Sequence, residues 1–244
     1  MAVEKPGPAI FVTGTDTGVG KTMVTAALAL HFRSRGLKVG VMKPIETGVE
    51  DPGALGPDAA LLRWAAQAEA EESLLSPYRF ALAASPHQAA EQAAAHIDVK
   101  TILDAYNTLR QGKDVMLVEG AGGLMVPIRG GYLMADLAGQ LDLPLMVITR
   151  PGLGTLNHTL LTTFSARAMD LALSGFIINR MPRDPDTIEA AAPHLLSSLA
   201  SADLLGVLPE VDGSSDEEKV TQLAAEIDQL PAYQWLLNGL GLEL

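Results

Sequence analysis

The stretch GTDTGVGKT at positions 14–22 constrains the fold of this 244-residue chain more than any other feature. It follows a short apolar run at 10–12 and precedes an alanine- and leucine-rich stretch at 24–32. This is the order of strand, glycine-rich loop and helix in which a Gly-Lys-Thr sequence cradles a phosphate group. Backbone N–H groups of the loop and the positive end of the helix dipole would converge on the anion. A chance Gly-Lys-Thr in a surface turn is the alternative, and the flanking pattern argues against it.

Two side chains of this loop would complete the phosphate site. Lys21 would reach the β- and γ-phosphates, and the Thr22 hydroxyl would bind Mg²⁺. The spacing departs from the common GxxxxGK[ST] signature, because Thr15 stands where that signature has glycine and Gly14 comes one residue earlier. The loop is therefore a variant of the common signature, which limits the families to which the chain could belong.

Apolar runs of strand length alternate with helical segments along the whole chain. Strands are expected at 37–42, 115–118, 144–149, 175–178 and 204–208, and helices from 58 and at 85–96, 98–111, 132–141, 154–169, 186–199 and 216–230. This alternation predicts an α/β fold with a mostly parallel sheet covered by helices on both faces. Together with the phosphate loop at 14–22, it indicates a fold of the P-loop NTPase type. We expect one domain over 1–244, with 1–8 as a loose tail, because no repeat or linker divides the chain.

Composition narrows the classes of partner. The net charge of −12 argues against a general nucleic-acid binder, which would need a basic stripe. No apolar run approaches the ~20 residues that a membrane span requires. The chain has no cysteine, which excludes disulfides, thiolate metal sites and cysteine nucleophiles. We therefore expect a cytoplasmic protein that acts on small molecules, with neither nucleic acid nor membrane as a partner.

Two charged residues adjoin the predicted strands. Lys43 follows the strand at 37–42, which lies one βα unit after the phosphate loop, so we expect the two strands to be neighbours in the sheet. A second cation there would stabilise charge on a transferring phosphoryl group, and the alternative is a surface lysine. Glu119 follows the strand at 115–118 and precedes a glycine-rich loop. A carboxylate in this position holds Mg²⁺ in P-loop enzymes, and the alternative is a solvated loop residue.

Two other kinds of candidate are less informative. Asp58 stands at the start of an alanine-rich helix, where an N-cap is the simplest interpretation. The five histidines lack the HExxH-type spacing typical of zinc sites, and only His158 lies near a helix start.

Six blocks of the sequence, taken together, resemble dethiobiotin synthetase. They stand in that family's order and span nearly the whole chain: GTDTGVGKT, KPIETG at 43–48, SPH at 85–87, VEGAGG at 118–123, GTLNH at 154–158 and GVLP at 206–209. The phosphate loop alone indicates a superfamily, whereas the ordered set is specific. The resemblance implies an ATP- and Mg²⁺-dependent ligase that closes the cyclic urea of dethiobiotin from 7,8-diaminononanoate and CO₂. A carbamate and a mixed carbamic–phosphoric anhydride would be intermediates, and ADP and phosphate would be released.

The resemblance also implies roles for particular residues. Mg²⁺ would be bound by Thr22, Asp58 and Glu119, which changes Asp58 from a cap to a ligand, and Lys21 and Lys43 would be the catalytic lysines. The nucleotide would contact Gly18, Val19, Gly20, Lys21, Thr22, Met23, Asp58, Glu119, Gly120, Ala121, Gly122, Asn179, Arg180, Pro209, Glu210 and Val211. The diamine substrate would contact Thr17, Thr47, Gly154, Thr155 and Asn157.

A homodimer with a shared active site is also implied, with Gly154, Thr155 and Asn157 supplied by the partner chain. The helix expected to start here would offer free N–H groups and a positive dipole end to a carboxylate, unless Thr155 only caps it. Two positions depart from the family. Gly18 stands where glutamate is common, and Arg180 stands where a relative carries aspartate.

Two other classes share parts of this pattern. A partition-type ATPase would carry an extra lysine early in the phosphate loop, where this chain has Thr15 and Asp16, and often a basic amphipathic helix, whereas 230–244 has no lysine or arginine. A cobyrinate-type amidating ligase would need an attached glutaminase domain with a nucleophilic cysteine, and the chain has none.

Overall fold

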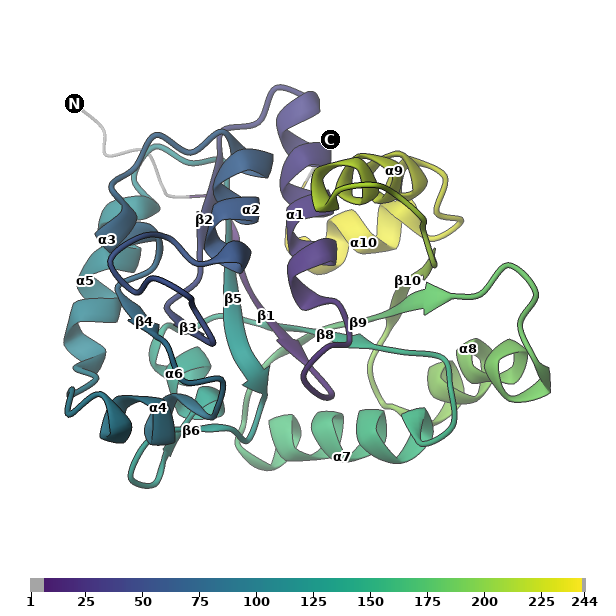
Figure 1. Cartoon of the computed structure of the whole chain (residues 1–244). Coiled ribbons are helices and arrows are strands. Elements are labelled where there is room, and N and C mark those ends of the chain that lie inside the picture. Colours follow the sequence, from purple (N-terminus) through teal and green to yellow (C-terminus); the bar gives the residue numbers. More distant parts are fainter. Residues whose placement is uncertain (1–6, 243–244) are drawn as a thin grey trace.

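The computed structural model describes residues 7–242, and its centre is a parallel sheet of six strands (Figure 1). The strands lie in the order β10-β9-β8-β1-β5-β2, and every neighbouring pair is parallel. Their bounds are Ala9–Gly14 (β1), Val39–Met42 (β2), Val115–Gly123 (β5), Leu145–Thr149 (β8), Leu173–Met181 (β9) and Leu204–Pro209 (β10). The central strands are nearly continuous apolar runs because helices cover both of their faces.

Helices pack on both sides of this sheet (Figure 1). One side carries α1 (Lys21–Ser34), α2 (Pro57–Ala66), α9 (Asp216–Asp228) and α10 (Tyr233–Leu240). The other side carries α6 (Met134–Gln140), α7 (Thr155–Ala168) and α8 (Thr187–Leu199). The expected α/β fold, with a mostly parallel sheet between helices, is therefore confirmed.

Smaller elements surround the β2 edge. The short helices α3 (Glu72–Leu75) and α4 (Pro86–Gln92) and the helix α5 (Val99–Leu109) lie there with a two-stranded parallel sheet, β3 (Ile45–Thr47) and β4 (Tyr78–Phe80). An antiparallel pair joins β6 (Pro127–Arg129) to β7 (Tyr132–Leu133). The β3 strand carries residues that face the site described below.

The strand order corrects one expectation. We expected β2, which precedes Lys43, to lie beside β1, but β5 lies between them and pairs with both. Glu119 also lies within β5 rather than after it, opposite Val12 in the register. The carboxyl ends of β1, β5 and β2 therefore bring the phosphate loop, Glu119 and Lys43 to one edge of the sheet, where ligands bind in open α/β folds.

Some predicted boundaries were wrong. The helix expected at 85–96 ends at Gln92, and Ala94 has a positive φ of 49° that cannot continue it. The helix expected at 132–141 begins only at Met134, after β7. Of the expected loose tail at 1–8, residues 1–6 lie outside the described residues. Gly7 and Pro8 are not loose, because the N–H of Gly7 donates to Lys113 O (3.3 Å) and Pro8 O accepts from the N–H of Met116 (3.0 Å).

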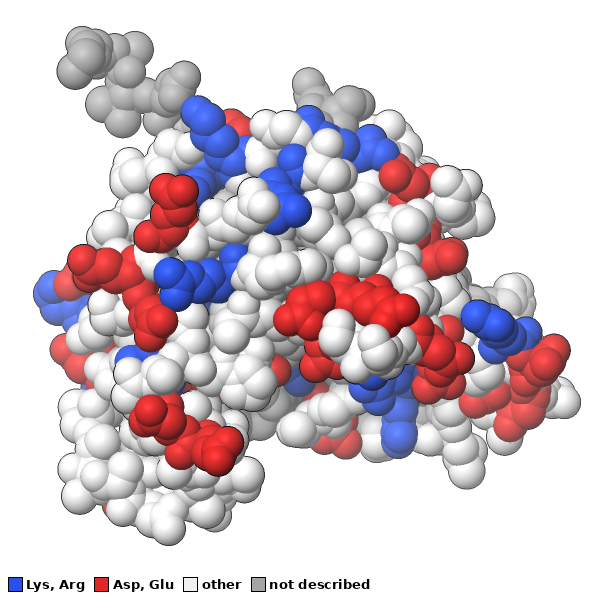
Figure 2. All heavy atoms as spheres, turned by 45° about the horizontal axis from the view of Figure 1, so that its top comes forward, with Lys and Arg blue, Asp and Glu red and all other residues white. Residues whose placement is uncertain are grey.

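The face drawn in Figure 2 has no continuous stripe of basic side chains. Lysine and arginine are interspersed there with aspartate and glutamate, and the most extensive group of charged side chains is acidic. None of the helices between residues 7 and 242 has the length and apolarity needed to cross a membrane.

Candidate active site

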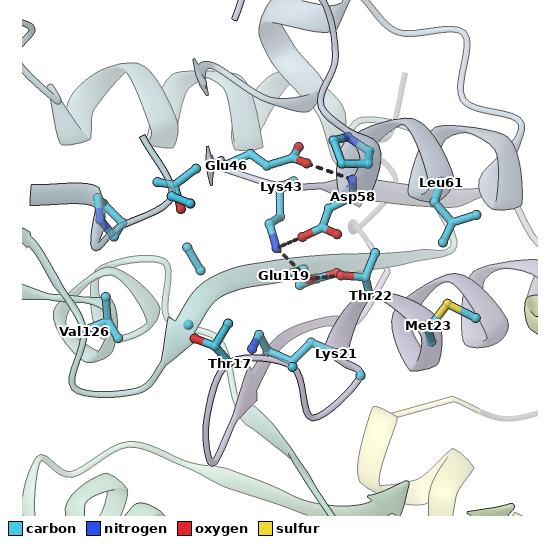
Figure 3. Close-up of a pocket in the computed structure, with 18 of the residues that line it drawn as sticks. Thr17, Lys21, Thr22, Met23, Lys43, Glu46, Asp58, Leu61, Glu119 and Val126 are labelled. Carbon is cyan, nitrogen blue, oxygen red and sulfur yellow. Dashed lines mark hydrogen bonds and ion pairs between the residues drawn. The ribbon is translucent and has the colours of Figure 1, made fainter. Parts of the chain in front are cut away.

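A cleft of about 610 Å³ opens at the carboxyl ends of β1, β5 and β2 (Figure 3). Thirteen of the residues expected from the sequence line it: Thr17, Gly18, Gly20, Lys21, Thr22, Met23, Lys43, Thr47, Asp58, Glu119, Ala121, Gly122 and Arg180. They come from positions spread over most of the chain, so the fold brings together what the sequence separates.

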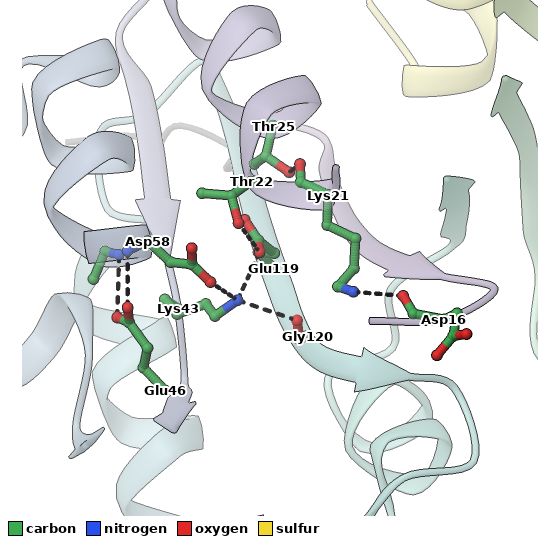
Figure 4. Close-up of polar contacts among 10 residues, drawn as sticks. Asp16, Lys21, Thr22, Thr25, Lys43, Glu46, Asp58, Glu119 and Gly120 are labelled. Carbon is green, nitrogen blue, oxygen red and sulfur yellow. Dashed lines mark hydrogen bonds and ion pairs between the residues drawn. The ribbon is translucent and has the colours of Figure 1, made fainter. Parts of the chain in front are cut away.

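The phosphate loop places an ammonium group and free N–H groups at one end of this cleft. Lys21 is the first residue of α1, and its Nζ donates to Asp16 O at 3.0 Å (Figure 4). Gly20 caps α1 with a φ of 93° and no side-chain hydrogen bond, so the first N–H groups of the helix stay available to an anion. Burial lowers the pKa of Lys21 from its usual value, and the Lys43 charge acts in the same direction.

Lys43 lies at the centre of a buried ion network (Figure 4). Its Nζ donates to Glu119 Oε1 at 2.6 Å, lies 2.8 Å from Asp58 Oδ2, and approaches Gly120 O at 3.5 Å. Only 4% of the Lys43 side chain is exposed and none of Glu119, whereas 39% of Asp58 is exposed toward the cleft.

The pKa values follow from this arrangement. Burial alone would lower the pKa of Lys43, but the carboxylates of Glu119 and Asp58 hold it above its usual value. Burial raises the pKa of Glu119 despite the neighbouring ammonium. For Asp58, the opposing effect of burial is outweighed by Lys43, which holds its pKa below the usual range. Lys43 is therefore a fixed positive charge at the centre of the network.

Thr22, Asp58 and Glu119 form a donor set that fits Mg²⁺ bound together with a nucleotide. The Thr22 hydroxyl donates to Glu119 Oε1 at 2.8 Å, and Glu119 Oε2 is buried with no hydrogen-bond partner. Mg²⁺ in such sites is held by one or two carboxylates plus substrate phosphates rather than by an all-protein cage. The described residues contain no group of three or more His, Cys, Asp and Glu side chains arranged for a metal.

The structure corrects the interpretation of Asp58 as an N-cap. The N-cap of α2 is Gly56, and Asp58 is the second helical residue, with its carboxylate directed at Lys43 instead of at the helix N–H groups. Those N–H groups are bound by Glu46, which lines the cleft. Glu46 belongs to the KPIETG block at 43–48, but the sequence pattern predicted no role for it. The uncapped Gly-Pro start of α2 is the signal that could have indicated a cap from elsewhere in the chain.

A second cavity, of about 430 Å³, adjoins the cleft beyond the phosphate loop and shares Met23, Arg180 and Asp216 with it. It is lined by the expected residues Asn179, Arg180, Pro209, Glu210 and Val211 and also by Asp212, Gly213, Asp216, Lys219 and Leu223, which sequence reasoning did not assign. Those unassigned residues lie in α9 or just before it, far along the chain from the phosphate loop. No local sequence pattern connects them with that loop.

Asn179 ties this cavity to the phosphate loop. Its Nδ2 donates to Val19 O at 3.0 Å, and its Oδ1 is buried without a hydrogen-bond partner. A Cβ on Gly20 would approach the same Nδ2 to 2.1 Å, so glycine is required for this close packing. Arg180 follows with a φ of 61°, a left-handed conformation that is uncommon for residues other than glycine.

Other expected residues lie outside both cavities. Val19 and Gly120 take part through their carbonyl oxygens, in the contacts with Asn179 and Lys43 described above. Gly154, Thr155 and Asn157 line neither cavity of this chain. The Thr155 hydroxyl is buried and hydrogen bonded to Thr149 Oγ1 at 2.9 Å, so it does not cap α7. The N-cap of α7 is Gly154, with a φ of 94° and no side-chain hydrogen bond.

The fold and the site define a P-loop protein that binds a nucleoside triphosphate. A protein-family model described as an AAA domain matches residues 8–218. The ATP-dependent dethiobiotin synthetase of Thermodesulfovibrio yellowstonii is 41% identical over 82% of this chain and 87% of its own length. The enzyme of that name from Bacillus subtilis strain 168 is 34% identical over 85% of this chain and 89% of its own length. The chain belongs to the ATP-dependent dethiobiotin synthetase family.

Solved structures of lower identity share the fold. The MinD cell division protein of Aquifex aeolicus aligns with a TM-score of 0.56 at 16% identity, covering 96% of each chain. A ParA family ATPase from Chlorobium tepidum aligns with a TM-score of 0.52 at 14% identity, covering 95% of this chain and 97% of its own. At these identities the comparison indicates a common fold only.

We expect Lys43→Met to lower kcat by a hundredfold or more and to leave the chain folded. Loss of one preorganised charge contact in a dry site costs ~3 kcal/mol of transition-state stabilisation. The measurement is ATP-dependent ligase turnover at saturating substrates, with circular dichroism as a check of folding. The matched control is Lys38→Met, at the exposed opposite end of the same strand. Activity of the Lys43 variant within a few-fold of the control would contradict the role of Lys43.

Proposed function

We propose that the protein closes the ureido ring of dethiobiotin from 7,8-diaminononanoate, CO₂ and ATP in a Mg²⁺-dependent reaction. The observation that carries this proposal is the buried Lys43 ammonium, held beside two carboxylates and facing the same cleft as the phosphate loop. A P-loop enzyme that only hydrolyses ATP needs a positioned water. A second fixed cation in the cleft suits an anionic acceptor such as a carbamate.

The reaction begins when one amine of the substrate adds to CO₂ and loses a proton, which gives a carbamate. A carbamate oxygen then attacks the γ-phosphorus of ATP, the bond to the β-phosphate oxygen breaks, and ADP leaves. The neighbouring amine attacks the carbamate carbon and loses a proton, and phosphate leaves with the oxygen that had bridged carbon and phosphorus. Phosphorylation is needed because an unactivated carbamate oxygen is a poor leaving group.

The chain's own residues would position and stabilise these groups. Lys21 and the free N–H groups at the start of α1 would hold the phosphates, and Lys43 would stabilise charge on the carbamate and on the transferring phosphoryl group. Thr22, Asp58 and Glu119 would hold Mg²⁺, which supplies neutralisation of phosphate charge when bound. Thr17 and Thr47, which also line the cleft, would contact the diamine.

The second cavity would take the base. The unpartnered Oδ1 of Asn179 is an acceptor that suits the exocyclic amine of adenine, whereas guanine presents an oxygen at the equivalent position. Residues 209–211 would frame the ring, and Arg180 lies between this cavity and the phosphate loop. This arrangement supports ATP as the nucleotide.

A homodimer with shared active sites is the proposed assembly. Leu153, Leu161 and Phe164 are 80%, 56% and 62% exposed, and they place an apolar surface along α7, from its N-terminus into its C-terminal half. Gly154, Thr155 and Asn157 line neither of the two cavities described above. In a dimer packed through α7, the N–H groups at the start of α7 in one copy would reach the cleft of the other copy. There they could bind the substrate carboxylate, several methylenes from the amines.

The proposed activity is tested by phosphate release in the presence of ATP and Mg²⁺. We expect release with 7,8-diaminononanoate plus bicarbonate, dethiobiotin as the product, and only background release with cobyrinate plus ammonia. The second mixture serves as the control for an amidating ligase. Release at one rate with or without the diamine would contradict the proposal and would indicate a switch ATPase.

The shared site is tested by mixing inactive variants. Lys21→Ala removes the phosphate cation, and Asn157→Asp places a negative charge where the substrate carboxylate would bind. Asn157 is exposed, whereas Thr155 is part of a buried hydroxyl cluster and is a poorer choice. After subunit exchange we expect activity to return to about one quarter of the wild-type level, because half of the dimers are mixed and each has one intact site.

The control for this experiment is a mixture of Lys21→Ala with Glu119→Gln, two lesions in residues of the same cleft. In those mixed dimers every site carries one lesion, so no activity should return. If the mixture with Asn157→Asp also fails to recover after exchange has been verified, each chain contains its whole site and the shared arrangement is wrong.

A further inference from the structure

Glu46 is a buried carboxylate at the first turn of α2. It lies in β3, is 3% exposed, and lines the cleft (Figures 3 and 4). Its Oε1 accepts from the N–H of Asp58 at 2.8 Å, and its Oε2 accepts from the N–H of Ala59 at 3.2 Å. A carboxylate at a helix N-terminus is stabilised by the helix dipole as well as by these two bonds.

Every backbone N–H group in the first turn of α2, residues 57–60, has a hydrogen-bond acceptor. Pro57, the first helical residue, has no N–H, and the N–H of Ala60 donates to Gly56 O at 2.9 Å within the helix. Asp58 and Ala59 carry the remaining two N–H groups, and Glu46 accepts from both. Gly56 itself provides no side-chain cap. The start of α2 therefore depends on a residue from another element.

The chain around Gly56 is shaped to admit this carboxylate. A Cβ at position 56 would lie 2.4 Å from Glu46 Oε1, closer than any side chain can be. Gly56 has φ −72° and ψ 169°, an extended conformation that any residue can adopt. Position 56 therefore requires glycine because a larger residue would clash with the Glu46 carboxylate, and not because of its backbone conformation.

Two residues of the segment 43–46 contact Asp58. Glu46 binds its backbone N–H, and Lys43, three residues earlier, pairs with its carboxylate at 2.8 Å. The backbone and the side chain of Asp58 are thus both fixed by residues 43–46. A shift of the first turn of α2 would move the Asp58 carboxylate relative to Glu119 and Thr22.

We propose that Glu46 is a positioning residue that holds Asp58 in place for the divalent cation bound with the nucleotide. This inference rests on the proposed function, in which Asp58 is a Mg²⁺ ligand. Residues that orient metal ligands typically change metal affinity by 10- to 100-fold when they are substituted. Glu46 acts through Asp58 and needs no contact with the metal or the substrate.

The test measures the Mg²⁺ concentration at half-maximal binding of a non-hydrolysable ATP analogue, adenylyl-imidodiphosphate, by calorimetry. In Glu46→Gln, one oxygen acceptor is replaced by an NH₂ group that faces an N–H group, and the negative charge is lost. We expect the Mg²⁺ midpoint to rise roughly tenfold. Affinity for the analogue at saturating Mg²⁺ should stay within a few-fold of wild type.

The matched control is Asp98→Ala, which removes the side-chain cap of α5, a helix whose start lies outside the cleft. It should lower stability without moving the Mg²⁺ midpoint. Gly56→Ala provides a second approach that leaves Glu46 in place but crowds its carboxylate, and it should raise the midpoint in the same direction. An unchanged midpoint in both Glu46→Gln and Gly56→Ala would overturn the inference.

A double-mutant cycle tests whether Glu46 acts through Asp58. In an Asp58→Asn background, Glu46→Gln should produce little further change in the midpoint. An undiminished tenfold effect there would show that Glu46 acts independently of Asp58, which would also overturn the inference. Because this measurement uses no diamine, it can fail while ligase activity is demonstrated, and it can succeed even if the ligase assay fails.

Discussion

The buried ammonium of Lys43, held between Asp58 and Glu119, is the interaction on which the rest of the site depends. The charges of Lys43 and Glu119 would each cost several kcal/mol to bury alone, so these two groups require each other. Lys43 follows β2, Glu119 lies in β5 and Asp58 lies in α2, and the network therefore couples three elements at the mouth of the cleft. The Thr22 hydroxyl extends it to the phosphate loop through Glu119.

This network also explains how the site is prepared for its ligands. The Lys43 ammonium lies within hydrogen-bond distance of the carboxylates of Asp58 and Glu119 and offsets their negative charge. Glu119 and Asp58 both line the cleft, and Oε2 of Glu119 has no hydrogen-bond partner. The arrangement is thus set by the fold before a nucleotide enters, which is the condition for efficient electrostatic stabilisation.

Much of the fold could be predicted from the sequence because the responsible signals are local. Apolar runs at β1, β5 and β8 alternate with helical segments, and the glycine-rich loop gives the first strand–loop–helix unit without reference to the rest of the chain. Sheet order is not a local property. The long excursion between β2 and β5 allowed β5 to lie between β1 and β2, which neighbour rules did not anticipate. That insertion is what places Glu119 between Lys43 and the phosphate loop.

The same distinction between local and distant signals applies to the residues of the candidate site. Lys21, Thr22 and Glu119 stand in short motifs with a known physical purpose, and the structure brings them together. Asp58 looked like a cap because the Gly-Pro sequence before it does not indicate which residue of the chain binds the helix N–H groups, and the structure shows that Glu46 does so. Glu46 and the α9 residues at the second cavity act across distances along the chain that no local pattern records.

The central claim is that a carbamate oxygen, rather than water, attacks the γ-phosphorus. The most direct test uses CO₂ labelled with ¹⁸O on both oxygens, in unlabelled water, for a time short enough to limit exchange of the label with solvent. The account predicts one ¹⁸O atom in each phosphate released and one in the ureido carbonyl of the product, as measured by mass spectrometry. Phosphate that contains no ¹⁸O would contradict it, because its fourth oxygen would then come from water, and ATP cleavage would not activate the carbamate.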